Sequence, residues 1–101
     1  MLTKYQLITN LTGVNFRNVD LSGTNLTGGN FRNADLTDAD LSNANLSGEN
    51  LTNANLSDAD LSGADFSKTN LSGGDLTGSD LTDANLEGII IDENTKIEIP
   101  E

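Results

Sequence analysis

The side chains of this 101-residue chain that are able to do chemistry are carboxylates. The chain has no His, Cys or Trp, which excludes a thiol nucleophile, an imidazole base and Cys/His metal sites. Its 16 Asp and Glu residues face only 5 Lys and Arg residues, for a net charge of −11. Six of the aspartates recur at intervals of twenty residues, in two sets: Asp20, Asp40, Asp60 and Asp80, and Asp38 and Asp58.

Clustered carboxylates support three kinds of chemistry. They bind divalent cations through oxygen ligands, they act as an acid–base pair where a pocket perturbs one pKa, and they attract cationic partners through a field of one sign. What they do here depends on the backbone that positions them.

That backbone follows a period of five. Leu or Phe stands at every fifth position from Leu11 to Leu86, each time directly after Asn or Asp. A period of five fits neither an α-helix nor a flat strand, so the chain must turn once per pentad. The residue two places after each Leu or Phe is mostly Gly, Asn or Asp, which suits a corner. Repetition over the whole length is typical of a solenoid, with a short strand and a corner per pentad.

Runs such as 39–43 (Ala-Asp-Leu-Ser-Asn) and 64–68 (Ala-Asp-Phe-Ser-Lys) resemble the pentapeptide-repeat family. The resemblance covers about residues 9–88. It implies an all-β fold, a right-handed quadrilateral β-helix with about four coils of four pentapeptides. We expect an N-terminal cap at residues 1–8, the β-helix at residues 9–88, and a C-terminal cap or dimerisation segment at residues 89–101.

Four pentads per coil place residues twenty apart in one column, about 4.8 Å from each other. The predicted core contains the inward Leu and Phe side chains, among them Leu21, Leu41, Leu61, Leu81, Phe16, Phe31 and Phe66. Stacked aspartates repel, so we expect raised pKa values for Asp40 and Asp60.

Glu49 is the anomaly, because it occupies a small inward position between Gly29 and Thr69 in its column. A buried carboxylate without a partner is costly. We expect the gap at Gly29 to let the carboxylate reach water or a backbone donor. The alternative interpretation is a notch for a ligand.

A convex solenoid offers no pocket for catalysis, so we predict a non-enzymatic structural or protein-interaction scaffold without a cofactor or metal. Its candidate interaction surface is the set Asp20, Asp38, Asp40, Asp58, Asp60 and Asp80, although acidic side chains also keep repeat proteins soluble. One subgroup of the family mimics DNA and binds DNA gyrase or topoisomerase IV, which is the alternative function. A further alternative is divalent-cation binding by the Asp ladder.

The partner is expected to be an unknown protein, with no direct nucleic acid binding and no membrane association. A homodimer through the Ile-rich C-terminal end is compatible with a cap there. No signal peptide is visible, so we expect a cytoplasmic protein.

Overall fold

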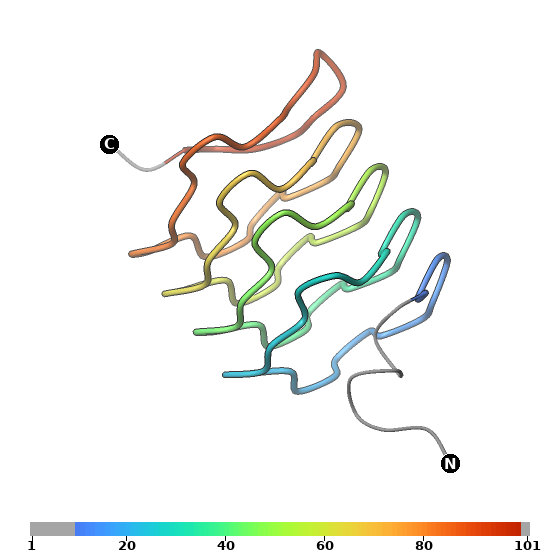
Figure 1. Cartoon of the computed structure of the whole chain (residues 1–101), viewed down its shortest axis with the longest axis vertical. Coiled ribbons are helices and arrows are strands. Elements are labelled where there is room, and N and C mark those ends of the chain that lie inside the picture. The colour runs from blue at the N-terminus through green and yellow to red at the C-terminus, as the bar shows by residue number, and fades with distance from the viewer. Residues whose placement is uncertain (1–9, 100–101) are drawn as a thin grey trace.

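The computed structural model describes residues 10–99, which wind into a stack of coils running from the blue N-terminal to the red C-terminal end of Figure 1. The predicted N-terminal cap at residues 1–8 lies outside the described residues. Within residues 10–99 there is no helix and no continuous strand, and the backbone instead pairs through isolated parallel bridges. Two residues of every pentad form the corner, which leaves a single bridging residue where we had expected a short strand. No helix in the described range is long and apolar enough to cross a membrane.

The bridges join residues twenty positions apart, which is the predicted period. Four ladders begin at Asn15, Asp20, Asn25 and Asn30, and each continues through the following coils. We call twenty consecutive residues a coil and residues twenty apart a column. The bridging residue is always the Asn or Asp before the inward Leu or Phe, until the C-terminal end.

Each pentad folds through two local devices. The carbonyl of the inward residue accepts a hydrogen bond from the amide three residues later, as Leu41 O does from Ala44 N at 3.0 Å. The corner residue between them has positive φ, 59° at Asn43. Only Gly, Asn and Asp adopt this conformation readily, which explains why they dominate these positions. Lys68, at φ 59°, is the exception.

The core runs without interruption along the stack and is formed by the inward side chains of successive coils. Leu41, Leu61, Phe31 and Phe66 are fully buried, and Leu81 is nearly so. Ala fills most of the small inward positions between them. Two predicted core residues, Phe16 and Leu21, are only partly buried. They belong to the first described coil, so just one flank of each is covered by a neighbouring described coil.

The C-terminal end departs from the period by one residue. Ile90 still pairs with Asn70, but Lys96 pairs with Asp75, at a separation of twenty-one. The extra residue lies in a turn in which Thr95 N donates to Asp92 O at 3.2 Å. Ile97 and Ile89 pack against the core, while the large apolar side chains left exposed are Ile90, Ile91 and Ile99. The domain boundaries at residues 88 and 89 stay a prediction.

Candidate functional site

The acidic face comprises Asp20, Asp38, Asp40, Asp58, Asp60 and Asp80. Four of these residues bridge one another directly in a single ladder that runs from Asp20 to Asp80. Asp38 and Asp58 stand at the preceding corner, both exposed and both with positive φ. The structure therefore brings all six predicted residues to two adjoining columns.

Every aspartate of the ladder is anchored by the residue two places later. Asp40 Oδ1 accepts a hydrogen bond from the Ser42 hydroxyl at 2.6 Å and from the Ser42 amide at 3.0 Å. Asp60 accepts the same pair of bonds from Ser62, at 2.6 and 3.0 Å. Ser22 and Thr82 provide them for Asp20 and Asp80. These turns hold each carboxylate in one orientation.

The hydroxyl partners were missed in the sequence reasoning, although the signal was present as Asp-x-Ser/Thr at a fixed spacing. They alter the electrostatics of the ladder. The Ser22 hydroxyl, and then its amide, lower the pKa of the Asp20 carboxyl, and Thr82 lowers the pKa of Asp80 in the same way. At both ends of the ladder hydrogen bonding outweighs the other influences on the carboxyl group.

Basic side chains lie outside the acidic face. Arg17 Nη1 donates to Asp35 Oδ2 at 3.4 Å, and both side chains are solvent-exposed enough for this pair to contribute little to stability. Asp35 has its pKa lowered, first by the Thr37 hydroxyl and amide and to a smaller extent by Arg17. No Lys or Arg occurs in the two columns of the acidic face.

The predicted alternative of divalent-cation binding finds no support in this geometry. Among residues 10–99, no three acidic side chains gather as ligands around a common point. A ladder spaces its carboxylates along a line, whereas calcium requires six to eight oxygens around one centre.

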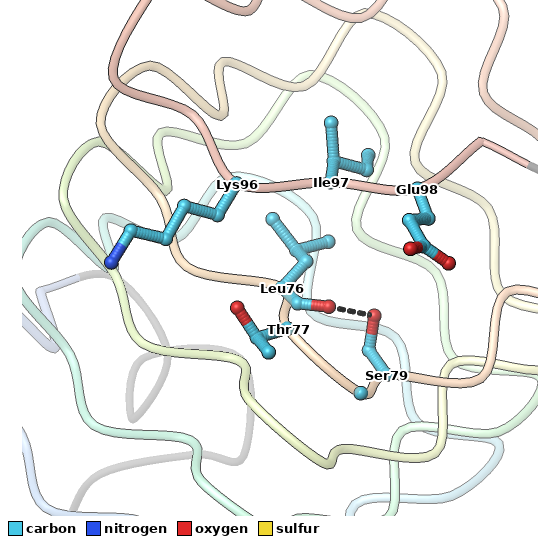
Figure 2. A pocket seen from close by; sticks show the side chains of 7 residues that line it. Leu76, Thr77, Ser79, Lys96, Ile97 and Glu98 are labelled. Atoms are coloured by element: carbon cyan, nitrogen blue, oxygen red, sulfur yellow. Dashed lines mark hydrogen bonds between the residues drawn. The ribbon is translucent and has the colours of Figure 1, made fainter.

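A pocket of about 500 Å³ lies at the C-terminal end, between the last regular coil and the segment that follows (Figure 2). Leu76 and Ile97 form its apolar side, and Lys96 and Glu98 border it. The Ser79 hydroxyl donates to Leu76 O at 2.8 Å, so it is engaged by the backbone. No residue of the acidic face lines this pocket.

Glu49 occupies the inward position that the sequence assigned to it. Glu49 is 2% exposed, and Oε1 accepts a hydrogen bond from Gly29 N at 3.1 Å, a backbone donor, which is one of the two kinds of partner that we expected. Oε2 is buried without a hydrogen-bond partner. Desolvation raises the pKa of the Glu49 carboxyl to about 7, although the amides of Gly29 and Gly28 favour the charged form.

Comparison with known proteins places this geometry in a family. A family model described as pentapeptide repeats matches residues 9–48, 34–73 and 50–88. No curated protein sequence is significantly similar to the chain.

Three solved structures of cyanobacterial pentapeptide repeat proteins are similar. HetL of Nostoc sp. strain PCC 7120, which is involved in heterocyst differentiation regulation, is 38% identical with a TM-score of 0.81, over 84% of this chain and 39% of HetL. Rfr23 of Cyanothece 51142 is 39% identical with a TM-score of 0.62, over 79% of this chain and 65% of Rfr23. The protein alr5209 of Nostoc PCC 7120 is 31% identical with a TM-score of 0.70, over 87% of this chain and 73% of alr5209.

This chain thus spans less than two thirds of the length of HetL and of Rfr23. The repeat period, the parallel ladders and the family match agree with one another over residues 9–88. The chain belongs to the pentapeptide-repeat family.

Proposed function

We propose that this protein is a non-enzymatic scaffold, a right-handed quadrilateral β-helix of about four coils whose acidic face binds a cationic surface on a partner protein. The observation that carries the proposal is the Asp20 to Asp80 ladder, in which every Oδ1 is held by a hydroxyl and an amide. The second oxygen of each carboxylate is left for a partner. No basic side chain occupies the same columns.

Anchored carboxylates suit binding for a physical reason. A side chain that is already ordered loses little conformational entropy when a partner docks. A row of like charges also accelerates encounter with a cationic surface, and this effect weakens as salt rises. We therefore expect salt-sensitive association.

The test removes charge without removing the anchor. In the double variant Asp40→Asn, Asp60→Asn the amide oxygen keeps the acceptor role that Asn45 Oδ1 plays for Ser47 N at 3.0 Å. The control variant Asp65→Asn, Asp75→Asn removes two charges from other ladders. Affinity for a lysine-rich peptide, measured by titration calorimetry at low salt, should fall in the first variant and persist in the control. Equal losses of affinity in both variants would mean that binding depends on the net charge of the protein and not on the acidic face.

The same two variants can be used to identify natural partners by capture on the immobilised protein. Proteins retained by the immobilised wild-type chain and by the control, but lost with Asp40→Asn, Asp60→Asn, are candidate partners. If the two variants retain the same proteins, the acidic face does not select a partner.

The alternative function is that of a DNA mimic directed at gyrase or topoisomerase IV. About four coils at a spacing of roughly 4.8 Å display acidic surface over only about 20 Å. We therefore expect no inhibition of gyrase supercoiling at micromolar protein. Salt-sensitive inhibition that disappears in Asp40→Asn, Asp60→Asn would make topoisomerase the partner instead.

We further propose self-association through the C-terminal end. Ile90, Ile91 and Ile99 are exposed there. Apolar side chains gathered at the end of a stack favour a second copy. Ile90→Ser with Ile91→Ser should shift sedimentation toward monomer. Changing Ile89 or Ile97 would disturb packing on the core as well.

A further inference from the structure

One inward column differs from the other three. Small inward positions hold mostly Ala, with Val, Thr, Ser and Gly at the ends of the columns, but the fourth column reads Gly29, Glu49, Thr69 and Ile89. Thr69 is fully buried and satisfies its hydroxyl by donating to Leu46 O at 2.6 Å. Glu49 is the member whose polar atoms are incompletely satisfied.

The backbone above Glu49 is also irregular. Each inner pentad normally donates from the inward residue and from the corner residue to the next coil, and from the bridging residue to the coil before. Between pairs of residues that both lie within 11–70, two of these bonds are lost or weakened. They are Gly28 N to Ser47 O and Asn50 N to Gly29 O; Asn30 and Asn50 still form a parallel bridge, so the second contact is weakened and not lost.

The lost and weakened bonds and the carboxylate mark the same place. Gly29 N lies 3.1 Å from Glu49 Oε1 and 3.4 Å from Leu26 O, the longest corner bond of the series. The carbonyl of Ser47 lacks the amide donor that its counterparts in other pentads keep, and the contact between Asn50 N and Gly29 O falls short of hydrogen-bond geometry. We call this interruption between Gly28–Gly29 and the following coil the seam.

We propose that Glu49 is a proton-operated latch on the seam. The protonated, neutral carboxyl stays packed beneath Gly29 and holds the first coil against the next. The ionised carboxylate draws water to Oε2 through the seam, where the backbone hydrogen bonds are fewest and weakest, and the first coil loosens.

Within residues 10–99, no charged neighbour competes for this role. The described residues that stack on Glu49 in its column, Gly29 and Thr69, do not titrate, and burial and the two glycine amides perturb the carboxyl group. Lys68 precedes Thr69, but its side chain is exposed and its Cγ lies over the Gly88 position, on the far side from Gly29. Arg32 is exposed on the outer surface.

The direction of the pH dependence follows from the linkage between protonation of Glu49 and folding. The folded protein holds the Glu49 proton more tightly than the unfolded chain, with a pKa of about 7 against 4.5. The stabilisation from the neutral carboxyl is fully present below about pH 4.5 and is lost as pH rises through about 7. The latch is therefore closed in mild acid and released above neutrality.

Amide hydrogen exchange on the full chain tests the latch residue by residue. Protection factors, which correct for the intrinsic effect of pH, should fall about tenfold or more at Gly29 and other first-coil amides between about pH 5 and about pH 8. Amides of the third coil, such as Leu61 N, should change much less. Carbon-detected titration of the Glu49 carboxyl supplies a direct readout, with a midpoint near 7.

Three variants separate the latch from a merely packed side chain. Glu49→Gln keeps the shape without the proton and should make first-coil protection independent of pH. Glu49→Ala places the commonest inward residue at this position. It should also make first-coil protection independent of pH, with tighter packing between the coils. Glu87→Gln, at an exposed site, should behave like the wild type. Persistent pH dependence in Glu49→Gln, or none in the wild type, would overturn the proposal.

Discussion

The regular wall, by which we mean the pentads that keep all their backbone hydrogen bonds, and the seam are built from the same pentad. A carboxylate nevertheless has opposite surroundings in the two regions. On the wall, Asp40 stands outside and receives two hydrogen bonds on one oxygen while the other faces solvent. At the seam, Glu49 stands inside, receives one bond from Gly29, and keeps an oxygen buried without a partner. The backbone hydrogen bonds are complete beside the first, whereas two of them are lost or weakened beside the second. The position of an acid within the pentad decides how well its two oxygens are satisfied.

The largest expected effect comes from shortening a buried side chain in the core of the regular wall. Leu61 is fully buried, so Leu61→Ala should lower the free energy of unfolding by about 2–5 kcal/mol. Leu26, equally apolar and 3% exposed, lies beside the seam, where the backbone has more freedom to collapse into the cavity. Leu26→Ala should therefore lower the free energy of unfolding, measured by urea denaturation, by less than Leu61→Ala does. Equal costs would mean that the seam is as rigid as the wall.

The next effect concerns pH. Because burial raises the pKa of Glu49 to about 7, the free energy of unfolding should decline between about pH 4.5 and about pH 7, by on the order of 3 kcal/mol at most. Glu49→Ala should remove this decline and leave a more stable protein at about pH 8. Thermal melts across this range provide the measurement. A wild-type stability that rises over the same interval would contradict the assignment.

A smaller effect is expected at the corners. Gly63 and Gly23 both have positive φ, so alanine at either site should cost about 1 kcal/mol from backbone strain. At Gly63 an added Cβ would also collide with Asn43 Oδ1, whereas at Gly23 it would meet open space. Gly63→Ala should thus destabilise the protein slightly more than Gly23→Ala, by less than about 1 kcal/mol, because Asn43 Oδ1 is the end of a rotatable side chain. Identical melting temperatures would show that the Asn43 side chain moves aside freely.

The smallest effect belongs to the acidic ladder. Two carboxylates about 4.8 Å apart repel by roughly 0.9 kcal/mol in water, before screening by salt. Asp40→Asn with Asp60→Asn removes this repulsion and keeps the Oδ1 acceptors, so the melting temperature should rise slightly at low salt. The gain should shrink in high salt. A loss of stability would mean that the Ser42 and Ser62 hydroxyls favour a charged acceptor by more than the repulsion costs.

Much of the fold was predictable because a period of five leaves few choices. The inward burial of Leu41 and the corner at Asn43 follow from repeating one pentad, whereas the twenty-residue separation of Asp40 and Asp60 was implied by the resemblance to the pentapeptide-repeat family. The one-residue insertion that pairs Lys96 with Asp75 was not predictable, since the repeat has ended there and no periodic signal sets the register. The partial exposure of Phe16 and Leu21 depends on how a solenoid ends, which periodicity does not describe.

By itself the sequence determined which side chains face inward, which face outward and where the chain turns, because these properties repeat locally with every pentad. With the four pentads per coil that the family resemblance implies, it also placed Glu49 beneath Gly29. Only the tertiary structure decided that the Glu49 carboxylate has a single hydrogen bond and a pKa of about 7, and that two backbone hydrogen bonds beside it are lost or weakened. The reason is that solvation and hydrogen bonding of a buried acid depend on atoms twenty residues away, whose separation is set by the stacked backbone and not by the repeat.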